Sequence, residues 1–324
     1  MRETILCDNA LVAAEMLCRG QLVAFPTETV YGLGADATNS DSVAGIFESK
    51  QRPSFDPLIV HVPDMAAAQR VVVNFPLLAQ KLAEKFWPGP LTLVLPKQAQ
   101  VSDLVTAGLP GVGLRIPNHP LAMEVLKAVG RPVAAPSANP FGGISPTTAD
   151  HVLDGLGGKI DGVLDGGPCG VGLESTVVSL MIDQPILLRP GGLPVEDIEA
   201  VIGPVHRAVS DPLQDDAAQP APGMLSRHYA PKTVLQTIAP GDTARPIRNK
   251  ICGLLTYGRF PCAPGFEQIQ RLSESDDLRM CAANFFARLR SLDSANLDVI
   301  IARSFPAKGL GIALNDRLRR ATSV

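Results

Sequence analysis

A stretch rich in Pro, Gly, Asp and Ala between residues 203 and 223 constrains the fold most, because it divides the chain into two parts. Its four prolines fix φ and lack a backbone donor, so no regular helix or strand is expected there. The 324 residues suit two domains at the usual size of roughly 100–200 residues each. We predict a first domain over residues 1–205, a linker over residues 206–232 and a smaller domain over residues 233–324.

In the first part, short β-rich runs are mixed with helical patterns. Strands are expected at residues 22–25, 58–62, 91–95, 112–116, 132–135, 162–164 and 176–180, and helices at residues 11–17, 42–49, 77–86, 121–128, 149–156 and 196–202. Asp8 is the expected N-cap of the first helix. Long Gly/Pro-rich loops join several strands, so the pattern predicts an α/β fold with a twisted, mixed sheet rather than a doubly wound one.

Beyond the linker, β-rich runs alternate with helical patterns more regularly. Strands are expected at residues 234–238, 253–257, 269–272 and 299–302, and helices at residues 278–292 and 312–321. This alternation predicts a small parallel α/β domain.

Charge and cysteine content exclude several classes of protein. Lys and Arg number 29 against 32 Asp and Glu, so no overall field attracts nucleic acid. The six cysteines are scattered without a C-x-x-C pair, which fits reduced thiols, and no structural metal is expected. No segment reads as a signal peptide or as an apolar run of about 18 residues, so the protein is expected to be soluble and cytoplasmic.

The loop at residues 25–34 is the first candidate site, since it follows a buried strand where ligands of α/β sheets tend to bind. Thr27, Glu28 and Thr29 bring hydroxyls and a carboxylate into it. A turn whose side chains satisfy the local backbone would have the same composition. Its position directly after the strand favours a ligand site.

Lys50 and Arg52 stand at the end of an expected helix, and two interpretations are open for them. They are helix caps if they only stabilise the C-terminal end of the dipole. They are a phosphate clamp if the fork of Arg and the point charge of Lys meet a triphosphate. His61 lies in an apolar strand, where a histidine is more often structural than catalytic.

Further polar residues interrupt or follow the expected strands. Arg115 lies within an apolar strand, and a buried arginine needs a protein carboxylate or an anionic ligand. Loops of small residues carry Ser137, Asn139, Ser145, Ser175 and Arg189. Arg317, Arg319 and Arg320 form a short basic segment that we interpret as a solvated helix end.

Familiar catalytic templates are absent from the sequence. There is no P-loop, no G-x-G-x-x-G after a strand, no G-x-S-x-G elbow and no H-E-x-x-H. Loops that gather cations and hydroxyls on an α/β domain suit anion binding and positioning more than nucleophilic catalysis.

The chain resembles the YrdC-like threonylcarbamoyl-AMP synthase family in a series of ordered segments. They are PTETVYGLG, KQRP, PLIVHV, WPGPLTLVL, GLRIP, APSAN, SPT, DGG, GLESTVV and LLRPGG. The segments APGMLSRHYAP and GLGIALNDR are similar to the longer, two-domain members. The resemblance covers nearly the whole chain and implies a twisted, mixed-sheet YrdC-like domain with a basic cavity, followed by a smaller Rossmann-like domain.

The resemblance also implies a role for each matched residue. The threonine pocket would be lined by Thr29, His61, Arg115, the backbone of Ala135, and Ser175, with Arg115 pairing the amino-acid carboxylate. ATP would be surrounded by Lys50, Arg52, Asp56, Gly111, Ser137, Asn139, Ser145 and Arg189. Tyr229 would come from the linker and fold over the nucleotide as a lid.

The implied reaction joins L-threonine, bicarbonate and ATP into L-threonylcarbamoyl-adenylate and pyrophosphate, for N6-threonylcarbamoyladenosine (t6A) at position 37 of tRNA. Lys50 and Arg52 would be its catalytic cations, together with Mg²⁺ that accompanies ATP, and no tightly bound cofactor or protein nucleophile is implied. The expected partner is the threonylcarbamoyl-transferase machinery that modifies tRNA, with weak or no direct tRNA binding and no membrane.

Three alternatives stay open. An RNA-binding module is opposed by the acidic balance of the chain. A different ATP-dependent carbamoyl or adenylyl transferase would use another amino acid. The C-terminal domain, finally, would be only a scaffold for partner proteins if it adds nothing to the site.

Overall fold

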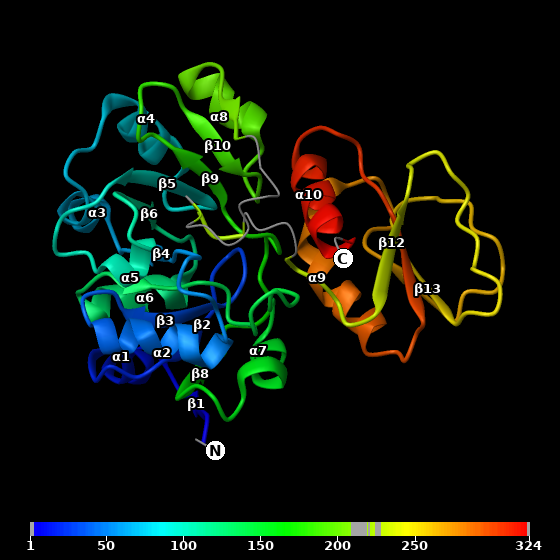
Figure 1. Cartoon of the computed structure of the whole chain (residues 1–324), viewed down its shortest axis with the longest axis horizontal. Coiled ribbons are helices and arrows are strands. Elements are labelled where there is room, and N and C mark those ends of the chain that lie inside the picture. Colours follow the sequence, from blue (N-terminus) through cyan, green and yellow to red (C-terminus); the bar gives the residue numbers. More distant parts are fainter. Residues whose placement is uncertain (1–2, 209–218, 220, 224–227, 323–324) are drawn as a thin grey trace.

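The computed structural model describes residues 3–208, 219, 221–223 and 228–322. It consists of a first unit (residues 3–208) and a smaller C-terminal unit (residues 233–322) that lie side by side (Figure 1). Much of the expected linker therefore lies outside the described residues.

In the described part of the first unit, eleven strands form one mixed sheet in the order β1-β8-β2-β3-β7-β4-β6-β5-β9-β10-β11. The strands are β1 (Ile5–Cys7), β2 (Val23–Phe25), β3 (Gly32–Asp36), β4 (Ile59–His61), β5 (Leu91–Pro96), β6 (Gly111–Arg115), β7 (Val133–Ala134), β8 (Gly162–Leu164), β9 (Thr176–Ser179), β10 (Ile186–Arg189) and β11 (His206–Arg207). The helices are α1 (Ala10–Cys18), α2 (Ser40–Lys50), α3 (Met65–Val71), α4 (Leu77–Phe86), α5 (Asp103–Thr106), α6 (Pro120–Val129), α7 (Ala149–Leu156) and α8 (Val195–Ile202).

The sheet mixes strand directions, as the sequence predicts. β4 runs parallel to β6 but antiparallel to β7, and β5 runs antiparallel to β6 but parallel to β9. In the β4–β6 pair, His61 stands opposite Arg115. The register of two buried strands thus places two of the predicted site residues side by side.

Some local features differ from the expected ones. β3 forms within the segment predicted as a loop, between β2 and β7. The N-cap of α1 is Asn9 rather than Asp8, because the Asn9 side chain accepts from the backbone amides of Leu11 and Val12. β11 pairs with β10 and so extends the sheet past the expected boundary at residue 205.

The C-terminal unit has a parallel four-stranded sheet in its described residues, in the order β12-β15-β13-β14. Its elements are β12 (Val234–Ile238), β13 (Cys252–Thr256), β14 (Gln268–Arg271), α9 (Leu278–Asp293), β15 (Val299–Arg303) and α10 (Leu310–Thr322). Figure 1 shows α9 and α10 on the side of this sheet that faces the first unit. The expected α/β class, with a mixed sheet and a small parallel one, is confirmed.

An apolar cluster joins the two units. Phe285 and Phe286 of α9 belong to the same buried cluster as Ile144 and Leu173 of the first unit. Gly172 lies so close to α9 that a Cβ there would be 2.4 Å from the carbonyl oxygen of Ala282. Burial of this apolar surface holds α9 against the first unit.

None of the helices in the described ranges combines the length and the apolar character that a membrane crossing requires.

Candidate active site

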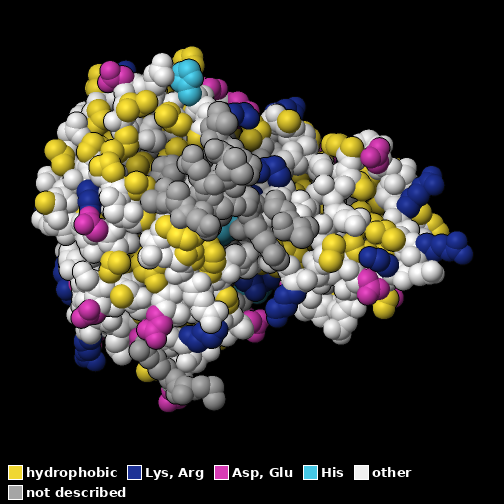
Figure 2. Space-filling model, viewed as in Figure 1, with side chains coloured by type: hydrophobic (Ala, Val, Ile, Leu, Met, Phe, Trp, Pro, Cys, Tyr) yellow, Lys and Arg dark blue, Asp and Glu magenta, His cyan; other side chains and the backbone are white. Residues whose placement is uncertain are grey.

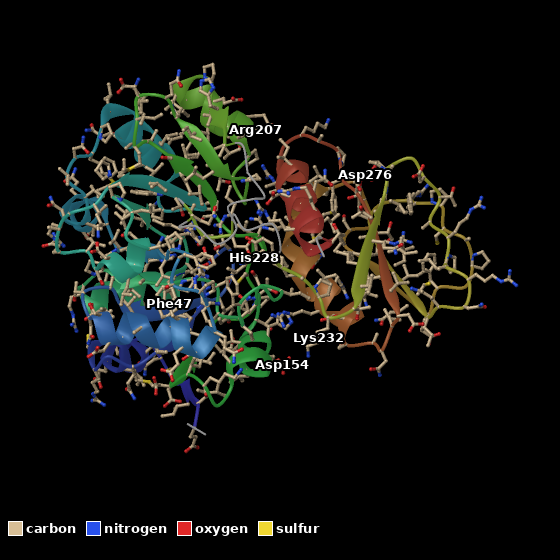
Figure 3. All side chains as sticks on the ribbon, viewed as in Figure 1. Phe47, Asp154, Arg207, His228, Lys232 and Asp276 are labelled. Carbon is tan, nitrogen blue, oxygen red and sulfur yellow. The ribbon has the colours of Figure 1, made fainter. Side chains whose placement is uncertain are left out.

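A small cavity of about 40 Å³ lies where strand ends of the first unit meet the residues that follow it. It is lined by Thr27, Thr29, Val30, Gly32, Arg52, Ile59, His61, Arg115, Ala135, Pro136, Ser137, Glu174, Ser175, Arg189, Pro222, Gly223, His228 and Tyr229. Figure 3 shows one of them, His228, between the two units. The site is therefore made by segments that are far apart in the sequence.

The loop between β2 and β3 supplies one wall. The hydroxyl of Thr27 donates to the carbonyl oxygen of Val30 at 2.7 Å and lies 2.8 Å from the hydroxyl of Thr29. The Thr27 side chain thus satisfies the local backbone, as one interpretation of this loop expects, and both Thr27 and Thr29 line the cavity.

His61 and Arg115 form the floor of the cavity from neighbouring strands. Burial, assisted by the nearby Arg115 charge, lowers the pKa of His61 from 6.5 to about 3. The imidazole is therefore neutral at physiological pH and offers one donor and one acceptor.

Arg115 has a protein carboxylate as its partner. Its Nη2 lies 2.8 Å from Oε1 of Glu28, and its Nε donates to the carbonyl oxygen of Gly89 at 3.2 Å. Both members of the pair are nearly buried. The guanidinium is thus fixed in orientation against the cavity, where it can meet a second, ligand carboxylate.

Lys50 ends α2 but does not cap it. Its ammonium donates to the carbonyl oxygens of Ser137, at 2.6 Å, and of Asn139. Only 1 % of Lys50 is exposed, and this burial, with help from Arg52, lowers its pKa well below the usual value. The side chain ties the end of α2 to the loop after β7, so the capping interpretation is wrong for Lys50.

Arg52 forms a buried pair with Asp56 at 2.9 Å. Its Nε and Nη2 donate to the carbonyl oxygens of Asp56 and Pro57 at 3.0 and 2.7 Å, respectively. Burial raises the pKa of Asp56, although Arg52 and Lys50 oppose the shift. Cations exceed anions in this part of the cavity wall, which suits an anionic ligand.

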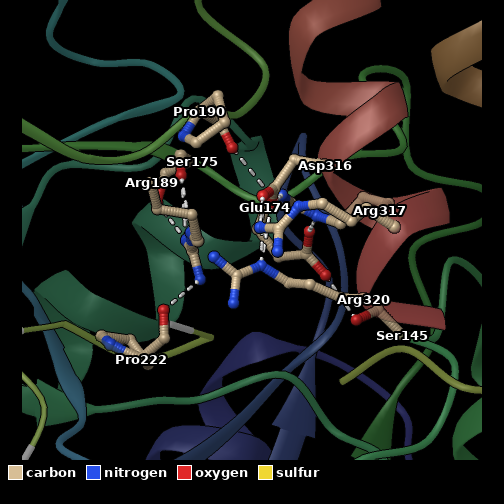
Figure 4. Close-up of polar contacts among 10 residues, drawn as sticks. Ser145, Glu174, Ser175, Arg189, Pro190, Pro222, Asp316, Arg317 and Arg320 are labelled. Carbon is tan, nitrogen blue, oxygen red and sulfur yellow. Dashed lines mark hydrogen bonds and ion pairs between the residues drawn. The ribbon is translucent and has the colours of Figure 1, made fainter. Parts of the chain in front are cut away.

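Ser175 and Arg189 form the opposite wall. The Ser175 hydroxyl lies 2.7 Å from the hydroxyl of Thr92 and accepts from Nη2 of Arg189 at 3.3 Å. The same guanidinium donates to the Ser175 carbonyl oxygen at 2.9 Å and, through Nη1, to that of Pro222 at 3.0 Å. Arg189 therefore holds the segment beyond the first unit against the cavity (Figure 4).

His228 and Tyr229 close the cavity from that segment. The two rings contact each other with centroids 4.0 Å apart, and Phe141 and Phe286 pack on either side of them. Burial, followed by the charges of Arg52 and other cations, lowers the pKa of His228 well below its usual value. Tyr229 adopts a left-handed φ of 61°.

Glu174 and Arg317 correct one expectation from the sequence. Arg317 is 0 % exposed, and its Nε donates to Oε2 of Glu174 at 2.8 Å (Figure 4). The prediction of a solvated basic helix end is wrong for Arg317 and for Arg320, which is also buried. Arg319, by contrast, has a side chain that is 55 % exposed.

The structure brings together most of the residues that the sequence singles out. All five expected threonine residues, Thr29, His61, Arg115, Ala135 and Ser175, line the cavity, as do Arg52, Ser137, Arg189 and Tyr229 of the nucleotide set. Four others each contact a residue that lines the cavity: Lys50 and Asn139 contact Ser137, Asp56 contacts Arg52, and Ser145 contacts Glu174. Gly111 does not line this cavity but lines an adjoining pocket that shares Ile59 and Pro222 with it.

Four residues of this site were not predicted from the sequence: Glu174, Gly223, His228 and Arg317. A signal for Arg317 was present, since it follows Leu310, Ala313 and Leu314 at helical spacing and so lies on the apolar face of α10. Nothing comparable distinguished Gly223 from the other glycines of the chain.

The carboxylates around the cavity form ion pairs with arginines. Glu28, Asp56 and Glu174 are paired with Arg115, Arg52 and Arg317, respectively. Across the described ranges, no cluster of three or more His, Cys, Asp or Glu side chains could hold a metal ion. The site is built for anions, with no carboxylate cage for a resident cation.

Two protein-family models match consecutive parts of the chain. The Sua5/yciO/yrdC model, described as telomere recombination, matches residues 15–191. The model described as the C-terminal domain of threonylcarbamoyl-AMP synthase matches residues 193–323.

Relatives match the chain almost end to end. The threonylcarbamoyl-AMP synthase of Bacillus subtilis is 45 % identical over 95 % of this chain and 91 % of its own length. That of Pyrococcus abyssi is 43 % identical over 99 % and 96 %, respectively. The crystal structure of P. abyssi Sua5 complexed with L-threonine is similar with a TM-score of 0.88 and 38 % identity, and the match covers 99 % of this chain and 97 % of that one.

Proposed function

This chain belongs to the threonylcarbamoyl-AMP synthase family and is an enzyme of that family, and on this premise we propose that it joins L-threonine, bicarbonate and ATP into L-threonylcarbamoyl-adenylate and pyrophosphate. The product would serve the synthesis of t6A at position 37 of tRNA. The observation that carries this proposal is the cavity in which Arg115, neutral His61 and Ser175 face the cations Arg52 and Arg189.

The threonine half of the cavity consists of Thr29, His61, Arg115, Ala135 and Ser175. Arg115 would bind the α-carboxylate of threonine, since Glu28 and Gly89 already fix its orientation. The hydroxyls of Thr29 and Ser175 and the neutral His61 would provide neutral hydrogen bonds to the threonine side chain. The P. abyssi complex with L-threonine supports this assignment by similarity.

The nucleotide half consists of Lys50, Arg52, Asp56, Ser137, Asn139, Ser145, Arg189 and Tyr229. Gly111 would contribute only from the adjoining pocket, which shares Ile59 and Pro222 with the cavity. Arg52 and Arg189 would neutralise phosphate charge, and Lys50 would hold the loop of Ser137 and Asn139 at the end of α2.

The chemistry would need no protein nucleophile. The threonine amine takes up the carbon of bicarbonate with loss of water and gives a carbamate. A carbamate oxygen then bonds to the α-phosphorus of ATP as the bond to pyrophosphate breaks. Placing three small substrates in contact and stabilising charge would supply the rate enhancement.

Mg²⁺ would enter with ATP. The described carboxylates around the cavity are paired with arginines, so the protein residues do not fit a separate Mg²⁺ site. Bound to the phosphates, Mg²⁺ would add positive charge where pyrophosphate leaves.

Tyr229 would act as a lid over the nucleotide. The cavity of about 40 Å³ is far smaller than the roughly 300–1,000 Å³ of a site for a drug-sized ligand. Tyr229 and its neighbours must therefore move to admit ATP. Their return would shield a water-sensitive adenylate until the threonylcarbamoyl-transferase machinery receives it.

Direct tRNA binding is expected to be weak or absent. On the face shown in Figure 2, the described basic and acidic side chains are interspersed. The chain has 29 Lys and Arg residues against 32 Asp and Glu residues, so its net charge gives no electrostatic reason for strong RNA affinity.

The test is pyrophosphate release from ATP and bicarbonate by the purified protein across all twenty amino acids, with the product identified by mass spectrometry. Release should require threonine and bicarbonate and should fall on the order of 10³-fold in Arg52→Ala, which removes a phosphate-facing cation. Arg19→Ala is the matched control, because Arg19 is exposed and pairs only with Glu15 among the described residues. Release that does not depend on threonine would favour another amino-acid substrate.

A further inference from the structure

Arg317 carries a contact from the C-terminal unit into the wall of the cavity. It lies on α10, and its Nη2 donates to the carbonyl oxygen of Pro190 at 3.0 Å while its Nε donates to Glu174 at 2.8 Å. Figure 4 shows the guanidinium reaching from α10 toward these two loops of the first unit. A full positive charge from one unit is thus buried in the other.

Glu174 connects Arg317 to the nucleotide half. One carboxylate oxygen accepts from Arg317, and the other accepts from the hydroxyl of Ser145 at 2.5 Å. Glu174 itself lines the cavity, directly before Ser175 in the chain. Because both of its oxygens are engaged, the position of this carboxylate depends on Arg317.

Arg317 also contacts the proposed lid. Its guanidinium carbon lies 4.6 Å from the centre of the Tyr229 ring, which is within the range of a cation–π contact. Phe286 of α9 packs on the same ring with centroids 5.8 Å apart. The ring of Tyr229 therefore rests on the C-terminal unit.

Asp316 fixes the guanidinium from its own helix. It accepts from Nη1 of Arg317 at 2.8 Å and from Nε of Arg320 at 3.1 Å. Burial raises the pKa of Asp316, but Arg317 and Arg320 outweigh burial and hold it below the usual value. An ionised Asp316 keeps Arg317 charged and pre-organised before any ligand binds.

We propose that Arg317 is a positioning residue through which the C-terminal unit shapes the nucleotide half of the cavity, an inference that rests on the proposed function. Three residues of the nucleotide half lie next to it: Tyr229 by ring contact, Ser145 through Glu174, and Arg189 beside Pro190. Thr29, His61 and Arg115 are held by other contacts within the first unit. Ser175 directly follows Glu174, but its hydroxyl is held by Thr92 and Arg189 of the first unit. Loss of Arg317 therefore weakens ATP use and leaves threonine recognition largely intact.

The experiment compares Arg317→Gln with Arg319→Gln. Both residues lie on α10 and contact Asp316, but Arg319 is exposed. In Arg317→Gln, the KM for ATP should rise about 10- to 100-fold, since small misplacement of a site costs this much. The dissociation constant for threonine, measured by calorimetry, should change far less, and Arg319→Gln should behave as wild type.

Two further variants separate positioning from general destabilisation. Arg317→Lys keeps the charge and should restore part of the ATP affinity. In Arg317→Gln/Glu174→Gln no unpaired charge is buried, so thermal stability should recover more than the KM for ATP does. If thermal stability and the KM for ATP recover together, Arg317 is merely structural and the proposal is overturned. The proposal is also overturned if Arg317→Gln folds with an unchanged KM for ATP, or if it loses threonine binding to the same extent as ATP binding.

Binding of a non-hydrolysable ATP analogue distinguishes failure of the proposed function from failure of the positioning role of Arg317. Wild-type protein that binds the analogue and threonine but forms no threonylcarbamoyl-adenylate contradicts the proposed function. Within that outcome, weaker analogue binding by Arg317→Gln still supports the positioning role, and unchanged analogue binding refutes it.

Discussion

The two halves of the cavity are built in different ways. The threonine half comes from the large sheet, where the register of β4 and β6 fixes His61 beside Arg115. The nucleotide half is assembled from the end of α2, from β10, from Tyr229 and from the contact with α10. The first unit alone therefore fixes the proposed threonine site, whereas the proposed nucleotide site depends on both units.

Replacing Arg115 should have the largest effect on threonine binding and would affect the threonine half alone. Arg115→Ala leaves Glu28 buried without its partner and removes the proposed carboxylate ligand. Threonine affinity should fall at least about 100-fold in calorimetry, the usual result of truncating a buried charge pair. Binding of an ATP analogue should persist.

A double variant separates recognition from burial of charge. Arg115→Ala/Glu28→Gln should recover stability in thermal melts, because no lone carboxylate is buried, but should not recover threonine binding. If threonine binding returns, or if the ATP analogue is lost as well, the two halves are not independent and the comparison fails.

Truncating the proposed lid, Tyr229, tests the nucleotide half. Tyr229→Ala removes a ring that is 1 % exposed and should lower the free energy of unfolding by about 3 kcal/mol in urea titrations. Synthesis of the adenylate should fall with it. In Tyr229→Phe the free energy of unfolding should be unchanged, because no hydrogen bond from the hydroxyl to a described residue is present. Equal destabilisation in both variants would show that the hydroxyl, not the ring, holds the units together.

All the residues that the resemblance assigns to the threonine half line the cavity, whereas only part of the nucleotide set does, and the reason is physical. His61 and Arg115 interrupt apolar strands, and a polar residue in such a strand is visible in the sequence itself. Arg317 pairs with Glu174 across 143 positions of the chain, so only the docking of α10 makes the contact. Its spacing from Leu310, Ala313 and Leu314 indicates burial, contrary to the solvated helix end that we expected, but does not show which residue it contacts.

The strand β3 was missed for a related reason. Gly32 and Gly34 read as turn residues, yet both lie in a fully buried strand. A Cβ at Gly34 would be 2.8 Å from the ring of Phe25, so the strand needs glycine for close packing. Local propensity cannot predict a contact that tertiary packing creates.

The charge state of His61 gives a further test of the threonine half. Its pKa is about 3 in the folded protein and 6.5 ordinarily, so the unfolded chain binds a proton first as the pH falls. The stability from this residue is complete above pH 6.5 and is lost as the pH falls toward 3. Between pH 6.5 and 5 wild type should lose about 2 kcal/mol that His61→Gln does not lose, as measured by urea titrations.

Threonine binding supplies the matching control. Because folded His61 stays neutral over this range, threonine affinity should be flat between pH 5 and 8. A threonine affinity that falls as the pH drops through 6.5 would mean that His61 is protonated in the folded protein. The threonine half of the cavity would then be open to water.

Replacing Gly223 should have the smallest effect and gives the finest test of the nucleotide half. It has a left-handed φ of +76°, and a Cβ there would lie 2.5 Å from the hydroxyl of Tyr229 and 3.2 Å from Nη1 of Arg189. Gly130 is the matched control, since it has a φ of +65° and a Cβ there would meet nothing within 4 Å. Both alanine variants should lose about 1–2 kcal/mol of stability from the left-handed backbone. Gly223→Ala alone should also raise the KM for ATP, because it displaces Tyr229 and Arg189. An equal KM for ATP in the two variants would mean that these side chains shift without affecting nucleotide binding, and that the nucleotide half tolerates such displacements.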